Sequence, residues 1–205
     1  MEIFTFILEK RYQVNTYLVI QKREAVLIDP SKGDKKIIQL LKEKDIKLTK
    51  ILLTHGHLDH ISGVEYFKRK TDSRIFIHKE DAKMLTDSKK NLSFFMGESI
   101  IAPLADKLLC NGETIKFGQN FFKVLHTPGH TKGSVCFLIG DKLFSGDTLF
   151  AGGVGRTDFP SGSHKDILTS IKSKLFTLPK STLVFPGHGP KTTIKKEILT
   201  NPFFN

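Results

Sequence analysis

Cysteine, acidic residues and long apolar runs are all scarce in this chain of 205 residues. The two cysteines, Cys110 and Cys136, stand in unrelated contexts, so we expect no disulfide framework and a reducing, cytoplasmic location. No apolar run approaches the roughly 20 residues needed to span a bilayer. The first ten residues contain a glutamate at position 2 and no small-residue cleavage site, which favours a first strand over a secretory signal.

The acidic residues are outnumbered by basic ones, 21 to 32, which gives a formal net charge of +11. The lysines of segment Asp34–Lys44 interleave with apolar residues as in an amphipathic helix. This pattern favours a solvated helix face over a nucleic-acid groove. We therefore expect neither a nucleic-acid nor a membrane partner, although a basic surface would attract an anionic small molecule.

The length and the 39% hydrophobic content are sufficient for one core, and the chain has no linker, low-complexity tract or short repeat. We therefore expect residues 1–205 to form a single domain. Apolar strand-like runs alternate loosely with helical patterns, which predicts a mixed α/β fold. We expect strands in 15–29, Thr49–Leu53, Arg74–Ile77, Thr114–Phe117, Phe121–Leu125, Ser134–Ile139, Lys142–Phe144 and Thr182–Phe185, and helices over Asp34–Lys44, Ile61–Lys70, His164–Leu175 and Thr193–Leu199.

The most informative stretch is Thr54–His60, with three histidines and an aspartate directly after an apolar run. Neutral imidazole and carboxylate are ligands that zinc, iron and manganese accept. His55 and His57 are two residues apart, so in an extended chain their side chains point the same way. Asp59 and His60 follow past a turn, where they can address a second ion.

Three later strands each lead a polar residue into a turn bounded by glycine or proline. These residues are His130 in Pro-Gly-His-Thr, Asp147 after Ser145-Gly146, and His188 in Pro-Gly-His-Gly. Each alone could be a simple turn residue, as we interpret Asp29 before Pro30. Together with Thr54–His60 they are the ligand set of a polynuclear metal site, because strands hold ligand geometry rigidly.

The seven residues resemble the signature of the metallo-β-lactamase superfamily, over about residues 15–201. Within it the chain resembles the type II glyoxalase (hydroxyacylglutathione hydrolase) branch, in a short form without the C-terminal helical domain. Segments Ser145–Phe150, Gly155–Asp158 and Asn201–Phe204 support this. The resemblance implies a four-layer αββα sandwich with metals at one edge.

The resemblance also implies roles for the seven residues. His55, His57 and His130 would hold one divalent ion, Asp59, His60 and His188 a second, and Asp147 would bridge both. Zinc is the expected metal, with iron or manganese as alternatives. The implied activity is hydrolysis of a thioester such as S-lactoylglutathione by a hydroxide held between the metals, with Asp59 and Asp147 as the acidic residues required for catalysis.

The implied partner is a small-molecule thioester, for which a glutathione conjugate is a candidate. Arg156 falls where the family places a basic contact to the glutathione carboxylate, and a guanidinium suits a carboxylate. The alternative is that Arg156 pairs with Asp158 and stiffens its loop. His126 could orient a metal ligand from behind, as metal sites usually require.

Other reactions share this fold. A persulfide dioxygenase would use His55, His130 and Asp147 as a facial triad around one iron. The residues around His188 and the Asn201–Phe204 tail favour the hydrolase. A tRNA 3′-processing endonuclease would need a basic, glycine-rich insertion that the sequence lacks. A β-lactamase is disfavoured by His60 and Asp147, and a non-enzymatic scaffold by the intact ligand set.

Overall fold

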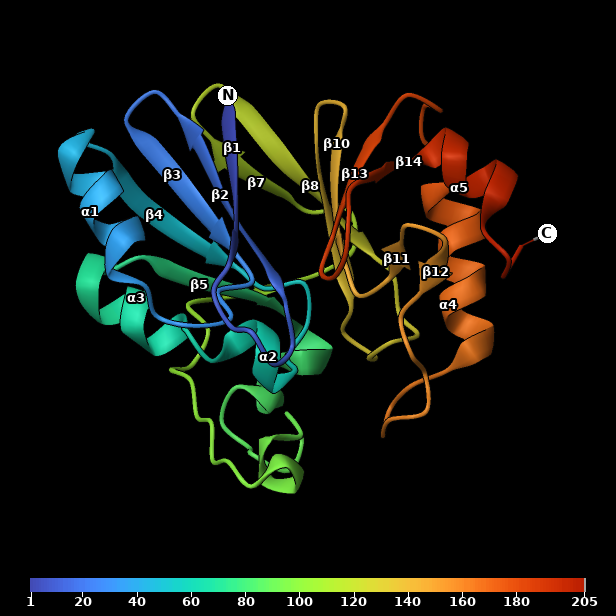
Figure 1. Cartoon of the computed structure of the whole chain (residues 1–205), viewed down its shortest axis with the longest axis horizontal. Coiled ribbons are helices and arrows are strands. Elements are labelled where there is room, and N and C mark those ends of the chain that lie inside the picture. Colours follow the sequence, from blue (N-terminus) through green and yellow to red (C-terminus); the bar gives the residue numbers. More distant parts are fainter. Residues whose placement is uncertain (205) are drawn as a thin grey trace.

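The computed structural model describes residues 1–204, in which two six-stranded sheets pack face to face (Figure 1). The first sheet has the strand order β1 (Glu2–Ile7), β2 (Asn15–Gln21), β3 (Glu24–Ile28), β4 (Lys47–Leu52), β5 (Arg74–His78) and β6 (Lys107–Leu109). The second has the order β14 (Thr192–Thr193), β13 (Leu183–Pro186), β10 (Lys142–Gly146), β9 (Val135–Ile139), β8 (Asn120–His126) and β7 (Thr114–Phe117). A small hairpin, β11 (Leu149–Phe150) and β12 (Gly153–Val154), follows β10.

Helices cover the outer face of each sheet (Figure 1). Helices α1 (Lys35–Glu43) and α3 (Val64–Thr71) cover the first sheet, and α4 (His164–Ser170) and α5 (Ile194–Thr200) cover the second. The predicted four-layer αββα sandwich is therefore confirmed. Among the described residues, no helix combines the length and apolar character needed to cross a bilayer.

Strand alternation builds the core between the layers. In β2, Tyr17 and Val19 face the opposite sheet, whereas Leu18 and Ile20 face the helices. Phe144 of β10 is fully buried between the sheets, with its ring centroid 5.2 Å from that of Tyr17. The two sheets therefore pack against each other through one apolar layer, to which each sheet contributes side chains.

The predicted elements match the structure except near the first ligand loop and in short pieces. The helix predicted over Ile61–Lys70 is wrong in its first part, because α2 (Leu58–Ile61) ends before α3 begins. Gly63 separates them: its N–H donates to the Pro30 carbonyl at 2.8 Å, and a Cβ there would lie 2.6 Å from the Lys32 carbonyl carbon. Asp59 and His60 therefore lie in α2 itself, not beyond a turn.

The sequence predicts no strand or helix between Ile77 and Thr114, and the structure has two short 3₁₀ segments there, Lys79–Met84 and Ser93–Met96. Four short strands, β6, β11, β12 and β14, have no counterpart in the sequence prediction. These pieces have two or three residues each, which is too short for a hydrophobic period to be read.

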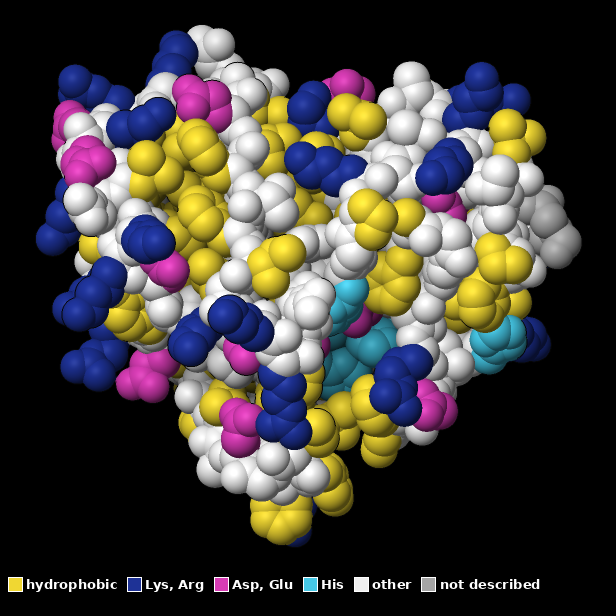
Figure 2. Space-filling view, in the orientation of Figure 1, with side chains coloured by type: hydrophobic (Ala, Val, Ile, Leu, Met, Phe, Trp, Pro, Cys, Tyr) yellow, Lys and Arg dark blue, Asp and Glu magenta, His cyan; other side chains and the backbone are white. Residues whose placement is uncertain are grey.

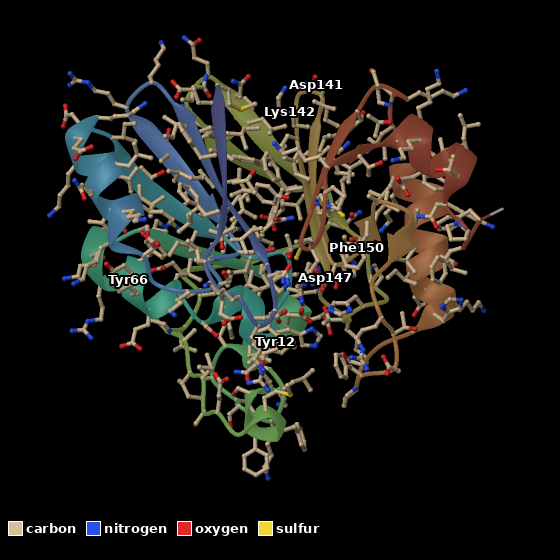
Figure 3. All side chains as sticks on the ribbon, in the orientation of Figure 1. Tyr12, Tyr66, Asp141, Lys142, Asp147 and Phe150 are labelled. Carbon is tan, nitrogen blue, oxygen red and sulfur yellow. The ribbon has the colours of Figure 1, made fainter. Side chains whose placement is uncertain are left out.

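The parallel strands of each sheet end at the same edge of the sandwich. β3 pairs with β4 in parallel, and β10 pairs with β13 in parallel. The carboxyl ends of these strands lead into the loops that carry the polar residues. Figure 3 shows Asp147 at this edge and Asp141 at the opposite end of β10.

The inner core gives a direct test of the packing. Phe144→Ala removes a fully buried ring, so we expect a loss of about 3–5 kcal/mol in the free energy of unfolding. Phe121→Ala is the control, because that ring in β8 of the same sheet is 54% exposed and its loss should change stability by at most about 0.5 kcal/mol. Urea unfolding measures both values, and equal losses in the two variants would contradict this packing.

Candidate metal centre

The residues that the sequence singles out meet where the two sheets end. His55 and His57 follow β4, and Asp59 and His60 lie in the single turn of α2. His130 follows β8, Asp147 follows β10, and His188 follows β13. All seven form three overlapping groups whose candidate ligand atoms lie within 4.8 Å of one another: His55/His57/His130, His55/His60/Asp147 and Asp59/His60/His188.

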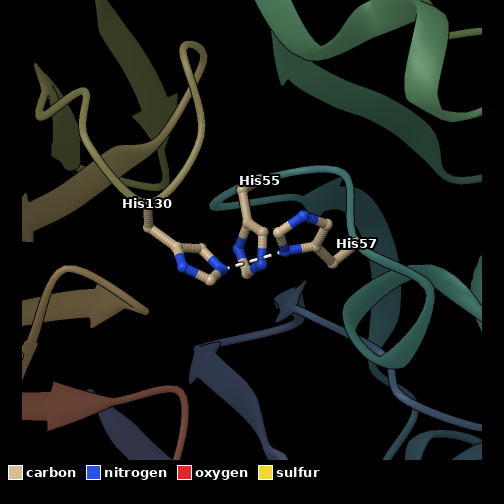
Figure 4. Close-up of side chains that lie close together, drawn as sticks. All are labelled: His55, His57 and His130. Carbon is tan, nitrogen blue, oxygen red and sulfur yellow. Dashed lines mark hydrogen bonds between the residues drawn. The ribbon is translucent and has the colours of Figure 1, made fainter. Parts of the chain in front are cut away.

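The first group consists of three buried imidazoles (Figure 4). His57 Nδ1 lies 2.9 Å from His130 Nε2, and the His55 ring centroid lies 4.8 Å from that of His57. Zinc binds imidazole nitrogen at about 2.0–2.1 Å in tetrahedral geometry, which brings ligand atoms to separations of this order. The three rings can therefore share one ion.

The group Asp59/His60/His188 combines a carboxylate with two imidazoles and is called the second group below. Asp59 Oδ2 lies 3.8 Å from His60 Nε2 and 3.6 Å from His188 Nε2. His60 is fully buried, whereas His188 is partly open to solvent. A second ion could be held here, on the side of the site nearer to water.

Asp147 lies between the two groups. Its Oδ1 is 3.3 Å from His60 Nε2, and its Oδ2 is 3.6 Å from His130 Nε2 and 3.4 Å from His188 Nε2. A carboxylate in this position can contribute an oxygen to each of two ions.

Three buried polar atoms of this cluster have no hydrogen-bond partner within the described part of the chain: His55 Nε2, His60 Nε2 and Asp147 Oδ1. A buried polar atom without a partner costs about 1–3 kcal/mol, so three of them in one cluster require an explanation. A metal ion in contact with each atom supplies it. The donor set thus fits divalent metals on its own geometry.

The protonation states of part of the cluster suit metal binding directly, whereas Asp147 raises the pKa of His60 and of His188 against the effect of burial, so a bound cation would displace their protons. Burial, and then the neighbouring His130, lower the pKa of His57 to about 3, so its ring is neutral near pH 7. Burial alone would raise the pKa of Asp147, but the imidazoles of His60 and His188 hold that pKa well below its usual value. Neutral imidazole and ionised carboxylate are the forms that bind a cation.

A further carboxylate holds His60 from behind. Asp29 Oδ2 is 3.0 Å from His60 Nδ1, which leaves Nε2 directed at the centre. The Asp29 carboxylate also accepts from Thr54, whose N–H donates to Oδ1 at 2.8 Å and whose hydroxyl donates to Oδ2 at 2.6 Å. The sequence interpretation of Asp29 as a turn residue agrees with its backbone, which has a φ of 49°. It does not include the contact that orients His60.

Asp81 is a second residue that the sequence did not single out. It is 1% exposed and accepts three hydrogen bonds: from the Gly56 N–H at 3.1 Å, the Thr131 hydroxyl at 2.6 Å and the Gly133 N–H at 2.8 Å. One carboxylate thereby joins the loop of His55 and His57 to the loop of His130. In the sequence it follows Lys79-Glu80, which looks like an ordinary exposed charge run.

Two other predictions concern neighbouring loops. Arg156 makes two hydrogen bonds to Asp158, of 2.7 and 2.6 Å, and its guanidinium carbon lies 3.8 Å from the Phe159 ring centroid. The loop-stiffening pairing is therefore present, although Arg156 also lines the cavity beside the site. His126 stacks on His78 at 4.0 Å and its Nε2 pairs with the Lys132 carbonyl, so its contacts differ from the predicted orienting role.

The model of the metallo-beta-lactamase superfamily matches residues 10–188. The chain is 39% identical to the "Probable metallo-hydrolase YqgX" of Bacillus subtilis, over 94% of the chain and 93% of that protein. It is 38% identical to the "Hydroxyacylglutathione hydrolase GloC" of Haemophilus influenzae, over 95% of the chain and 94% of that protein.

Solved structures give the same picture. The BLEG-1 B3 metallo-beta-lactamase is similar with a TM-score of 0.93 and 36% identity, over 99% of each chain. TTHA1623 in a di-iron-bound form has a TM-score of 0.86 and 38% identity, over 98% of this chain and 99% of its own.

The role of Asp81 can be measured through metal affinity. Asp81→Ala leaves three loop donors without their acceptor, so the His55/His57/His130 group should lose its fixed geometry. We expect the ion held by this histidine group to bind about 10–100-fold more weakly in a chelator competition. Glu80→Ala is the matched control, because this neighbouring carboxylate is exposed. Unchanged affinity in a folded Asp81→Ala protein would show that the shared carboxylate does not support the site.

Proposed function

The chain belongs to the metallo-β-lactamase superfamily, and we propose that this metallo-hydrolase cleaves thioesters at a pair of divalent metal ions. The observation that carries the proposal is the meeting of seven candidate ligands from four loops and helix α2. Three of these ligands have a buried atom without a partner among the described residues. The relative named hydroxyacylglutathione hydrolase supports the thioester as the substrate class.

In this proposal, His55, His57 and His130 would hold one ion, Asp59, His60 and His188 would hold the other, and Asp147 would contribute a carboxylate to both. Two such ions, when bound, make a water nucleophilic near neutral pH and polarise a carbonyl oxygen. We propose zinc as the metal. Iron is the alternative, supported by the di-iron-bound TTHA1623.

The residues of the chain supply what the reaction needs besides the metals. Asp29 and the carbonyl of Arg156, which accepts a hydrogen bond from His130 Nδ1 at 2.7 Å, fix two of the ligand rings. The leaving thiolate is weakly basic, with a thiol pKa of roughly 8.5, so departure requires no strong acid. The absence of a dedicated acid among the lining residues is consistent with this leaving group.

The proposed partner is a small molecule in the cytoplasm, without nucleic acid or membrane. The net charge of +11 would attract an anionic thioester such as a glutathione conjugate, which Arg156 could contact from the rim of the cavity. We also propose that residues 1–205 act as one domain, because ligands from both sheets are needed to complete the site.

A second reaction uses the same residues. His55, His130 and Asp147 could hold a single iron for persulfide oxygenation. The similarity to a B3 metallo-beta-lactamase also makes a cyclic amide a substrate to include. Persulfide oxygenation differs from thioester hydrolysis in its single iron and its oxygen uptake, and a β-lactamase differs in its substrate. One set of assays therefore separates the three reactions.

We expect the purified protein to contain two ions per chain and to hydrolyse S-lactoylglutathione, without oxygen uptake on glutathione persulfide and with weaker turnover of a chromogenic cephalosporin. Asp147→Ala should lose metal and at least about 100-fold of the activity, because the carboxylate joins both groups. Elemental analysis and absorbance assays measure these quantities.

Asp141→Ala is the control, since this exposed carboxylate lies at the far end of the same strand (Figure 3). It should retain full metal content and activity. One iron per chain with rapid oxygen uptake would replace the hydrolase by the dioxygenase, and near-normal activity in Asp147→Ala would refute the two-metal mechanism.

A further inference from the structure

The candidate metal centre opens into a cavity of about 760 Å³ whose walls are apolar. Figure 2 shows histidine side chains inside the hollow and hydrophobic side chains along its rim. This volume lies in the range of pockets that hold small organic ligands. The apolar lining comes from two parts of the chain, a first wall of Leu92, Phe95 and Met96 and a second wall of Phe150, Val154 and Phe159.

The first wall is unusually exposed for its composition. Phe95 and Met96 belong to the 3₁₀ segment Ser93–Met96 and are 67% and 40% exposed. When a ligand covers apolar side chains that are exposed to water at the mouth of a cavity, the free energy of binding becomes more favourable. The wall therefore favours a ligand with an apolar part.

The polar side chains of the lining are largely occupied. Five of them are candidate metal ligands: His57, Asp59, His130, Asp147 and His188. Arg156 is paired with Asp158 and covers the Phe159 ring. Of the lining residues, this leaves Tyr12 as the polar side chain that is neither a candidate metal ligand nor paired, whereas Arg156 can reach a ligand only from the rim. The inner cavity therefore offers little to a strongly hydrated substituent.

Resting on the proposed thioesterase function, we propose that the preferred thioester carries an apolar group, alkyl or aryl, beside the reacting carbonyl. This group lies between the Phe95/Met96 wall and the Phe150/Phe159 wall while the carbonyl faces the metal centre. The apolar group could belong to the acyl or to the thiol part, and the assay series below distinguishes these.

The test uses S-acyl glutathiones from acetyl to hexanoyl, together with the lactoyl compound. We expect kcat/KM to rise roughly three- to fourfold per added methylene, the value for burial of one CH₂. Phe95→Ala should flatten this slope. Phe94→Ala is the matched control, because this adjacent ring is 55% exposed and lies outside the cavity lining.

A second series keeps the acetyl group and lengthens the thiol, so a slope there and not in the first assigns the apolar group to the thiol side. Flat slopes in both series would overturn the proposal, and a lactoyl compound preferred over hexanoyl would exclude the acyl side as the place of the apolar group. S-methyl and S-hexyl glutathione cannot be hydrolysed, so calorimetry on these two compounds measures the affinity of the cavity for an alkyl group directly. Tighter S-hexyl binding without any thioester turnover would keep the pocket and reject the thioesterase function.

Tyr12 carries a second inference through a different observation. Its hydroxyl oxygen is shielded from solvent and has no hydrogen-bond partner in the part of the chain that the structure describes. The loop holding it is fixed, because the Tyr12 N–H donates to Glu9 Oε2 at 2.8 Å and the Arg11 guanidinium lies 5.1 Å from the ring centroid. Tyr12 lines the same cavity as Asp59 and Asp147, and Figure 3 shows Tyr12 and Asp147 at the same edge of the sandwich.

We infer that the Tyr12 hydroxyl donates a hydrogen bond to an acceptor oxygen of the bound substrate. Burial raises the pKa of this phenol, so it keeps its proton near pH 7. Tyr12 lines the cavity and a phenol is not one of the candidate ligands, so it is a positioning residue for the substrate.

Tyr12→Phe should lower kcat/KM about two- to tenfold, mainly through KM, with metal content and thermal stability unchanged. Tyr66→Phe is the control, because Tyr66 lies on α3 away from the site (Figure 3). An equal loss with lactoyl and propanoyl thioesters assigns the contact to the carbonyl, and a loss restricted to lactoyl assigns it to the α-hydroxyl. Unchanged kinetics with both would overturn the inference.

Discussion

The carboxylate of Asp147 lies within 3.6 Å of imidazole nitrogens from helix α2 and from two loops, and the geometry of the candidate metal centre is organised around it. The cluster is buried at the junction of the two sheets, where an unpartnered polar atom is costly. The pair of cations that we propose would compensate that cost. The candidate ligands are placed by strands that the inner core fixes.

The supporting contacts divide this work. Asp29 sets the direction of His60, and Asp81 joins the loops of the first histidine group. Neither residue touches the centre of the cluster. Both are buried carboxylates whose hydrogen bonds are made to the segments that carry the candidate ligands. Such contacts hold the ligands of a metal site in a fixed orientation.

Sequence patterns predicted the strand ends well, because hydrophobic runs followed by glycine or proline turns mark them directly. The seven polar residues from His55 to His188 could be found in this way, and the structure brings them together. The break at Gly63 was missed because it depends on close approach to the Lys32 backbone, a contact between residues that the helical pattern does not register.

Asp81, Tyr12 and the Phe95/Met96 wall were missed for a related reason. They lie in loops and 3₁₀ turns without a hydrophobic period, and their roles come from neighbours distant in the sequence. The apolar walls change the expected substrate from a hydrophilic conjugate toward one with an apolar group. Such specificity is set by loops on a shared scaffold and not by the scaffold itself.

The most direct test of the central claim is anomalous X-ray diffraction from crystals of the protein purified with its native metals. Two anomalous peaks about 3.5–4 Å apart, on either side of the Asp147 carboxylate, are the expected result. A single peak confined to His55, His57 and His130, or no peak at all, would contradict a paired metal centre.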